Sequence, residues 1–409
     1  MPPGFACLIG AQFFSALADN ALLIVGIFVL QEQGYPGWWA PLLKFSLNAA
    51  YVLLASGMGP LADAVPKARL MAWMNGLKMG GVLCLLAGLH PALAFAVIGL
   101  AASAYAPAKY GLVTESVSSA WLVQANAWLE VGVVLSVILG TALGGALVAL
   151  CQHPALVPLA DGTLAATLGQ TARSLPALLV VSLVYLLAAG LNAGIRPGRH
   201  APPLKPLCWA SVSWRSFWGT HRQLWRDPLG GLSLHVTTLY WGVGAVIQFA
   251  VLVWAQRQLG LPLQQGAYLQ ALVAVGVVAG AALAGRCYRL HAARGVLPIG
   301  LLLPALLPLI ALTTSLWLAL PLMLLVGMAG GLLLVPMNAL LQHRGRRVLR
   351  TGQSIAVQGF NENLSVLLML GVYSGLLALE WPIWAIMLCF SGVLAGGMLP
   401  LLWRRPPSR

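Results

Sequence analysis

Twelve apolar runs, each close to the length needed to cross a bilayer, recur along the 409 residues of this chain. A membrane-spanning helix needs about 20 apolar residues, and an open sheet would leave backbone groups unpaired in lipid. Charged residues make up only 8% of the chain, whereas a soluble domain has about 25%. The sequence therefore predicts an all-α polytopic membrane protein with transmembrane helices near 5–30, 40–62, 70–90, 92–112, 122–150, 174–195, 229–255, 266–290, 296–314, 316–340, 353–379 and 382–403.

The basic residues predict how these spans are oriented. With both termini placed in the cytoplasm, nineteen Lys and Arg residues fall on the cytoplasmic side and three (Lys44, Arg173 and Arg257) fall on the other side. This excess is the positive-inside signal of membrane proteins. Short basic loops also account for the net charge of +14, so no nucleic-acid partner is expected. The N-terminus lacks a cationic stretch before its apolar run, so no cleavable signal peptide is expected.

The longest polar stretch, 196–228, lies at the midpoint of the chain. It predicts an N-terminal six-helix bundle at 1–195, a cytoplasmic linker at 196–228 and a C-terminal six-helix bundle at 229–409. Within the linker, 209–226 has the pattern of an interfacial helix, with aromatic residues on one side and arginines on an adjacent stripe. A tether between the bundles is the favoured role of this helix, and lipid sensing is the alternative.

The two bundles share a pattern around their fourth and fifth spans. A proline (Pro107 or Pro336) marks the exit of one span, and an amide and an acid four residues apart begin the next. These pairs are Asn126 with Glu130 and Gln358 with Glu362, and residues four apart share a helix face. Six plus six pseudo-symmetric spans with a central linker form the major facilitator architecture, in which substrate binds near the midplane between the two halves.

Asp19 lies in the middle of the first predicted span, in a chain with only nine acidic residues. A charge at the bilayer centre costs roughly 2.5–3.5 kcal/mol on insertion scales. Asp19 is therefore predicted to face a polar path through the protein. Lys78 lies about nine residues inside the third span, where we favour a bundle-facing role over snorkelling to the interface.

Lys109 and Tyr110 lie at the predicted cytoplasmic end of the fourth span, and two interpretations of Lys109 stay open. It is a snorkelling anchor, or it binds a headgroup phosphate or pairs with Asp19. Paired charges would reduce each other's burial cost.

A further group of polar residues is predicted to act in gating or structure. The segment GPLADAVPKAR at 59–69 is similar to the loop motif of major facilitators, in which Asp63 pairs with a basic group and Lys67 and Arg69 add positive charge. Glu130 and Glu362 are expected to latch to basic loops across the cytoplasmic mouth in preference to contacting substrate. Asn126, Gln358, Asn361 and Asn363 add hydrogen-bonding capacity, and their simplest role is to join helices.

Motifs of several enzyme classes are absent from the sequence. It has no Walker motif, GxSxG, HExxH or pair of catalytic carboxylates. The six cysteines are scattered without CxxC spacing, so neither a disulfide framework nor a metal site is expected. The chain is accordingly predicted to be no enzyme and to use no cofactor.

Four segments together resemble the bacterial lysophospholipid transporters: QFFSALADNALL at 12–23, YAPAKYG at 105–111, VPMNALLQ at 335–342 and AVQGFNEN at 356–363. The resemblance runs nearly end to end. It implies an inner-membrane protein that moves lysophospholipids, chiefly lysophosphatidylethanolamine, to the cytoplasmic leaflet, where an acyltransferase/acyl-carrier-protein synthetase re-acylates them.

The resemblance also implies which residues form the polar pathway. An acidic residue in the first span and a lysine after the fourth correspond to Asp19 and Lys109. In the seventh span the family has an arginine, where WGVGAVIQF at 241–249 places Gln248. Gln248 keeps hydrogen bonding but lacks the positive charge. The expected substrate contacts are therefore Asp19, Asn20, Lys109, Tyr110 and Gln248, with Asp19 suited to an ethanolamine ammonium and Lys109 to a phosphate.

Two other functions compete with lysophospholipid transport. A proton-coupled exporter of drugs or metabolites could use Asp19 and Glu130 as proton carriers on the same architecture. A membrane scaffold for a lipid-remodelling enzyme would transport nothing. Charges inside the spans of both halves count against the scaffold, which does not need them.

Overall fold

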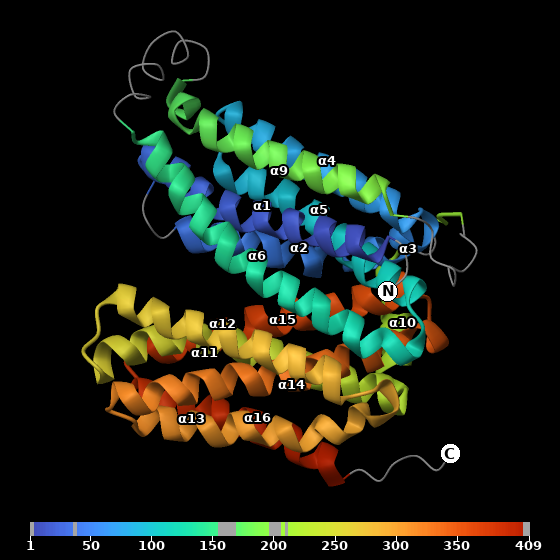
Figure 1. Cartoon of the computed structure of the whole chain (residues 1–409), viewed down its shortest axis with the longest axis vertical. Coiled ribbons are helices and arrows are strands. Elements are labelled where there is room, and N and C mark those ends of the chain that lie inside the picture. The colour runs from blue at the N-terminus through green and yellow to red at the C-terminus, as the bar shows by residue number, and fades with distance from the viewer. Residues whose placement is uncertain (1–3, 36–38, 154–168, 196–205, 209–211, 404–409) are drawn as a thin grey trace. The chain divides into compact units, whose positions relative to one another are not determined.

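The computed structural model describes residues 4–35, 39–153, 169–195, 206–208 and 212–403. Every regular element among these residues is a helix (Figure 1). Each of the twelve predicted spans corresponds to a helix or to a pair of consecutive helices. Their bounds are α1 (Phe5–Glu32), α2 (Trp39–Leu53) with α3 (Ala55–Ala64), α4 (Lys67–Leu86), α5 (Pro91–Ser116), η1 (Ser119–Trp121) with α6 (Leu122–Cys151), η2 (Gly169–Ser174) with α9 (Leu175–Ala193), α11 (Pro228–Gln258), α12 (Leu263–Cys287), η4 (Leu290–Leu301) with α13 (Leu302–Leu312), α14 (Leu316–Val348), α15 (Thr351–Ala378) and α16 (Ile383–Trp403).

Within the described part of the chain, ten helices are long and apolar enough to cross a membrane, or eleven if one bent pair is a single span. The bent pair is α2 and α3, which turn by 68° at Leu54. Pro60 lies inside α3 beside Gly57 and Gly59, and proline and glycine weaken the backbone hydrogen bonding that keeps a helix straight. The remaining helix, α4, has 20 residues but carries Lys67, Arg69 and Lys78.

Two proline-containing helices run further than the sequence suggested. α5 continues past Pro107 to Ser116, and α14 continues past Pro336 to Val348. The predicted ends at 112 and 340 were therefore too early. Proline inside a membrane helix is tolerated because neighbouring groups satisfy the freed backbone carbonyl. The extra turns matter because they carry Glu115, Gln342 and Arg344.

The chain forms two compact units. Unit 1 consists of Met1–Ser116 and Leu135–Phe217, and unit 2 consists of Val117–Val134 and Trp218–Arg409. The first part of α6 therefore packs with unit 2 and the rest with unit 1. In unit 1, α1 packs on α9, and α4 packs on both α5 and α9. The core of this unit includes Phe28, Phe95 and Tyr185.

Small residues bring helix backbones close together in unit 2. Gly276 and Gly280 of α12 face Gly327 and Gly331 of α14, and Figure 1 shows these two helices side by side. A Cβ at position 280 would overlap the carbonyl oxygen of Met328. Only glycine allows this approach, which is the small-xxx-small packing typical of membrane helices. In unit 1, Gly140 and Gly144 of α6 allow α1 the same close contact.

The helix predicted in the linker is present as α10 (Trp214–Arg226). Residues 209–211 of the predicted segment lie outside the described residues. Part of its aromatic side packs on protein: Trp218 and His221 contact Phe360 of α15 edge-on. Gln223 donates to the carbonyl of Val348 at 3.1 Å. Trp218 itself remains 47% exposed, so α10 is docked at its C-terminal half and still presents aromatic surface.

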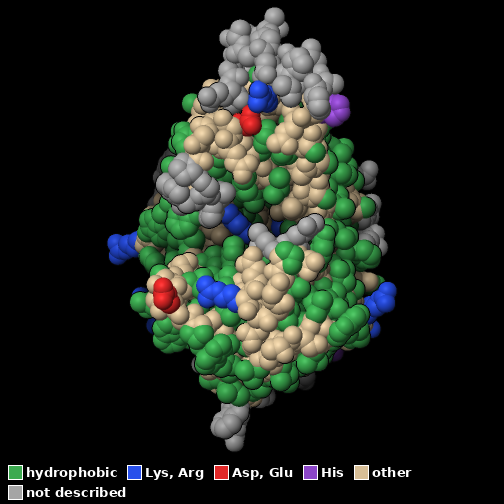
Figure 2. Space-filling model, turned by 90° about the vertical axis from the view of Figure 1, so that its left-hand side faces the viewer, with side chains coloured by type: hydrophobic (Ala, Val, Ile, Leu, Met, Phe, Trp, Pro, Cys, Tyr) green, Lys and Arg blue, Asp and Glu red, His purple; other side chains and the backbone are tan. Residues whose placement is uncertain are grey.

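The outer surface is largely apolar. Figure 2 shows a face composed mostly of hydrophobic side chains with few charged ones. Trp317, Leu312 and Leu379 are 84%, 68% and 69% exposed. Such exposure would be unfavourable in water, and it suits helices that contact lipid. The chain is thus a multi-pass membrane protein.

Candidate functional site

A buried polar network surrounds Asp19 in unit 1. The ammonium Nζ of Lys78 lies 2.6 Å from Oδ2 of Asp19, and the hydroxyl of Tyr185 donates to Oδ1 at 2.7 Å. These side chains come from α1, α4 and α9, so the carboxylate joins three helices. Each carboxylate oxygen has a charged or polar donor, which offsets much of the cost of placing Asp19 inside a span.

Further hydrogen bonds extend the network along α1 and α4. Lys78 donates to Oγ of Ser15 at 3.0 Å, and Ser15 donates to Oδ1 of Asn75 at 2.7 Å. The Lys78 ammonium also lies 5.0 Å from the ring centroid of Tyr105 and 5.7 Å from that of Tyr185. Aromatic faces at this distance stabilise a cation. The Lys78 side chain is therefore held in place by hydrogen bonds and by aromatic rings.

The two members of the ion pair differ in accessibility. The side chain of Lys78 is 1% exposed, whereas that of Asp19 is 29% exposed. A cationic ligand could therefore reach the carboxylate without first displacing the lysine. Lys78 is the residue that the sequence placed in the bundle, and the geometry agrees with that placement. The ion pair also corrects one of the interpretations left open for Lys109, that it pairs with Asp19.

Other residues predicted to contact substrate occupy varied environments. Asn20 donates its side-chain amide to the carbonyl of Ala16 at 2.7 Å within α1. Lys109 is 8% exposed, and its Nζ lies 4.2 Å from the ring centroid of Tyr110. Gln248, in unit 2, is exposed on α11, and its backbone carbonyl accepts from the side-chain amide of Gln270. Their contact with substrate stays a prediction.

The loop motif of unit 1 contains an ion pair that the sequence did not reveal. Lys67, at the first position of α4, lies 2.6 Å from Glu115 near the end of α5, and both side chains are 4% exposed. Asp63 is buried at the end of α3, and Arg69 is exposed. In the sequence, Lys67 was expected to add positive charge to the loop motif. It fastens two helices of unit 1, and the gating role of Asp63 and Arg69 stays a prediction.

Unit 2 is joined by neutral amides at the positions that the repeat pattern marked. Asn126 and Gln342 exchange hydrogen bonds of 2.9 and 2.7 Å between α6 and α14. Gln358 donates to Asn338 of α14 at 2.9 Å and to Glu362, one turn further along α15, at 2.8 Å. The bonds of Asn126 with Gln342 and of Gln358 with Asn338 are interhelical bonds of the kind expected for amides in membrane helices, whereas the bond of Gln358 to Glu362 lies within α15. The latch role of Glu130 and Glu362 stays a prediction.

Asp227 forms a second contact that sequence reasoning missed. It caps α11 by accepting from the backbone N–H of Gly230 at 2.7 Å, and Arg344 of α14 donates to its two carboxylate oxygens at 3.0 and 2.5 Å. Burial raises the pKa of Asp227, but these hydrogen bonds outweigh burial and hold its pKa below the ordinary value. The Asp-Pro step at 227–228 is a helix-start signal that could have identified the cap.

Comparison with known proteins identifies the family to which this chain belongs. The Major Facilitator Superfamily model matches residues 8–368. The chain is 36% identical over 383 residues to the lysophospholipid transporters of Yersinia pestis (strain Pestoides F) and Yersinia pseudotuberculosis (serotype O:3, strain YPIII), covering 92% of this chain and 87% of each relative.

Solved structures agree on the fold. The Escherichia coli fucose:proton symporter superposes with a TM-score of 0.74 at 13% identity, covering 98% of each chain. The human organic anion transporter superposes with a TM-score of 0.73 at 16% identity, covering 98% of this chain and 100% of the other. The match to the Yersinia relatives, over 92% of this chain, specifies the family more narrowly than these structures do. The chain therefore belongs to the lysophospholipid transporter family within the major facilitator superfamily.

Proposed function

We propose that the protein transports lysophospholipids, chiefly lysophosphatidylethanolamine, across the bacterial inner membrane to the cytoplasmic leaflet. Family membership supports the substrate class, because the Yersinia relatives carry the name of lysophospholipid transporters. The excess of basic residues in the predicted cytoplasmic loops supports the orientation, with both termini in the cytoplasm. A re-acylating acyltransferase/acyl-carrier-protein synthetase is the proposed functional partner on that side.

The observation that carries this proposal is the accessible carboxylate of Asp19 backed by the buried ammonium of Lys78. A lysophosphatidylethanolamine headgroup has an ammonium and a phosphate separated by two carbons. Its ammonium is complementary to the exposed oxygen edge of Asp19, and its phosphate to the ammonium of Lys109, the phosphate contact expected from the sequence. The single acyl chain can lie along apolar helix faces. Charge-assisted hydrogen bonds replace the water that the headgroup loses on leaving the membrane surface.

A transport step follows from competition at Asp19. Lys78 and Tyr185 hold the carboxylate when no substrate is bound. A substrate ammonium would take over part of that coordination and relax the contact between α1 and α4. Binding would then favour a different packing of these helices, which is the condition for a ligand to shift a conformational equilibrium.

The test is uptake of labelled lysophospholipids into proteoliposomes by the Asp19→Asn/Lys78→Met double variant. This variant keeps the site neutral and avoids leaving one charge unpaired. We expect transport of lysophosphatidylethanolamine to fall by about tenfold or more, the size of one lost charge-assisted contact, and transport of lysophosphatidylglycerol, which lacks the ammonium, to fall much less. Glu32→Gln, which alters the exposed ion pair with Arg173, is the matched control.

Two results would contradict the proposal. Equal losses of transport for both lysophospholipids would show that Asp19 does not recognise the ammonium. Collapse of wild-type uptake when the pH gradient is dissipated would instead favour a proton-coupled exporter.

A further inference from the structure

A pocket of about 450 Å³ lies in unit 2, at the end of the helices that the charge pattern assigns to the cytoplasmic side. It is formed by η1, the start of α11, the start of η4 and the end of α14. All of its residues belong to unit 2, whereas Asp19 and Lys78 belong to unit 1. The pocket is thus formed by different residues from the proposed transport site, and the transport proposal gives it no role.

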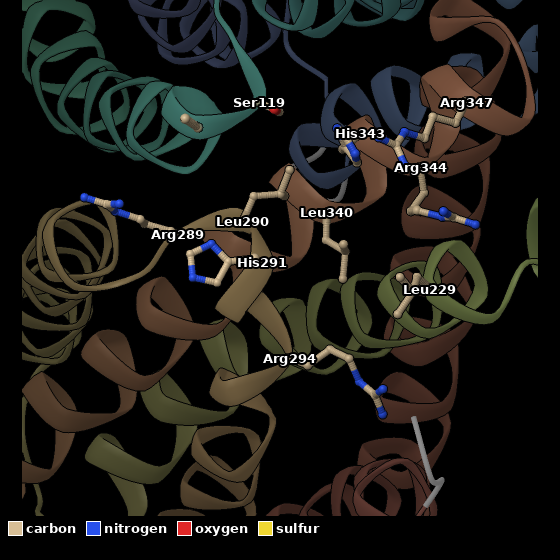
Figure 3. Close-up of a pocket in the computed structure, with 11 residues that line it drawn as sticks. Ser119, Leu229, Arg289, Leu290, His291, Arg294, Leu340, His343, Arg344 and Arg347 are labelled. Atoms are coloured by element: carbon tan, nitrogen blue, oxygen red, sulfur yellow. The ribbon is translucent and has the colours of Figure 1, made fainter. Parts of the chain in front are cut away.

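The rim of the pocket is strongly basic. None of the described residues that line it is acidic, and six of them are arginine or histidine: Arg289, His291, Arg294, His343, Arg344 and Arg347. Figure 3 shows the first three on the η4 side and the last three on the α14 side. Arg344 also pairs with Asp227, as described above. Four arginines around one concave site are expected to bind an anion, and the guanidinium fork suits phosphate in particular.

The floor of the pocket is apolar. Leu229, Leu290 and Leu340 line it, and Figure 3 shows Leu340 between the two basic sides. An apolar floor is unfavourable for inorganic phosphate, which is fully hydrated, and favourable for a group that continues into hydrocarbon. The pocket lies at the ends of α11 and α14, two candidate membrane spans, so it is expected near the level of the lipid headgroups. Basic pockets between membrane helices on the cytoplasmic side commonly hold anionic headgroups.

We propose that this pocket binds the phosphate of an anionic phospholipid headgroup, with its glycerol region against the three leucines. Binding would neutralise charges on α14 and η4. It would also affect the start of α11, because Arg344 donates to the carboxylate of Asp227, which caps this helix. The site would therefore link the anionic lipid content of the surrounding leaflet to the packing of unit 2.

The experiment is lipid titration of the purified full-length protein, read by native mass spectrometry. Phosphatidylglycerol and phosphatidylcholine with identical acyl chains separate anionic from zwitterionic headgroups, and inorganic phosphate tests a free anion. The pocket variant is Arg289→Gln/Arg347→Gln. The matched control is Arg257→Gln/Arg286→Gln, which removes the same charge from exposed positions of unit 2 outside the pocket.

We expect the pocket variant to bind phosphatidylglycerol about tenfold or more weakly, as for loss of charge-assisted hydrogen bonds, and the control to bind it within about twofold of wild type, as for loss of exposed, screened charges. Phosphatidylcholine and inorganic phosphate should bind far more weakly than phosphatidylglycerol. Equal losses in the two variants would show attraction to general surface charge and overturn the proposal. Equal affinity for inorganic phosphate would overturn the lipid assignment. If the pocket variant fails to fold, Arg289→Lys/Arg347→Lys keeps the charge and should still bind phosphatidylglycerol more weakly than wild type.

Discussion

The two units differ in the polar side chains that join their helices. Unit 1 contains two buried or half-buried ion pairs between helices, Asp19 with Lys78 and Lys67 with Glu115. Among its described residues, unit 2 has an ion pair of Asp227, at the start of α11, with Arg344, near the end of α14, and it joins helices with reciprocal amides, as between Asn126 and Gln342. Amides join helices within the membrane without net charge. An ion pair in the same place has a large desolvation cost, and charged residues inside membrane helices usually serve a function. The difference is that the pair of Asp19 with Lys78 lies in the middle of α1 and α4 and not at helix ends, and this supports the proposal that unit 1 recognises the headgroup.

The largest expected effect tests the charges of unit 1. Asp19→Asn leaves Lys78 unpaired at 1% exposure, and breaking a buried pair in this way destabilises by about 3–5 kcal/mol. Lys78→Met should destabilise less, because Asp19 is 29% exposed and can be hydrated. Thermal unfolding in detergent measures both changes.

The exposed pair Arg173 with Glu32 provides the control for this comparison. Arg173 is 42% exposed, and an exposed pair contributes about 0–1 kcal/mol. If Arg173→Gln lowered the melting temperature as much as Asp19→Asn does, the distinction between buried and peripheral charges in unit 1 would be lost.

Glycine packing is the feature that the units share, and it predicts the next largest effect. Gly280→Leu would place a side chain against the backbone of Met328 and force α12 and α14 apart. Overpacking of this kind costs about 1–3 kcal/mol. Gly330→Leu is the matched control, because a Cβ at that position would meet no atom of another helix within 4 Å. Similar melting temperatures for the two variants would show that the close approach contributes little.

The spans could be predicted from sequence because lipid leaves a chain few choices. Length and apolarity set each helix, and the twelve predicted segments correspond to the observed ones. The bend at Leu54 was not predicted, since proline and glycine weaken a helix without fixing where it breaks. Asp19 and Lys78 were each recognised as costly charges, but their pairing depends on how α1 and α4 are rotated against each other. Hydropathy carries no information on that rotation.

The missed contacts have a similar cause. Glu115 lies three residues beyond the predicted end of the fourth span, so it was assigned to a loop and its pairing with Lys67 was not considered. Gln342 likewise lies beyond the predicted end of the tenth span, and its partner Asn126 is 216 residues away in sequence. Helix ends are the least certain feature of a hydropathy profile, and Glu115 and Gln342 both lie near the ends of their helices.

A smaller effect tests the amides of unit 2. Gln342→Leu removes the donor to Oδ1 of Asn126, and interhelical hydrogen bonds in membrane proteins are worth about 0.6–1.7 kcal/mol. The double variant Asn126→Leu/Gln342→Leu should recover part of the loss, because both partners are then apolar. Unfolding of the four proteins of this cycle gives the coupling energy. A double variant as unstable as the sum of the single variants would show that the amides do not interact.

The smallest expected effect is a change in the docking of α10 with pH. Burial lowers the pKa of His221 from its ordinary value, although the hydrogen bond to Asn361 opposes this. His221 Nε2 lies 3.1 Å from the indole nitrogen of Trp225, which donates to it, and 3.2 Å from Oδ1 of Asn361. A neutral ring accepts from Trp225, and a protonated ring must donate to Asn361 instead.

The sign follows from the direction of the shift. Because the folded state holds the proton less tightly than the unfolded state, the contribution of His221 to stability is complete above its ordinary pKa of 6.5 and is lost as the pH falls through the lower folded value. We expect acidification below the lowered pKa of His221 to break its hydrogen bond with Trp225. Tryptophan fluorescence should then change reversibly. His221→Gln should remove that transition, whereas His153→Gln, on the other unit at the end of α6, should leave it. An unchanged transition in His221→Gln would assign it to another group, and the docking of α10 would then be independent of pH.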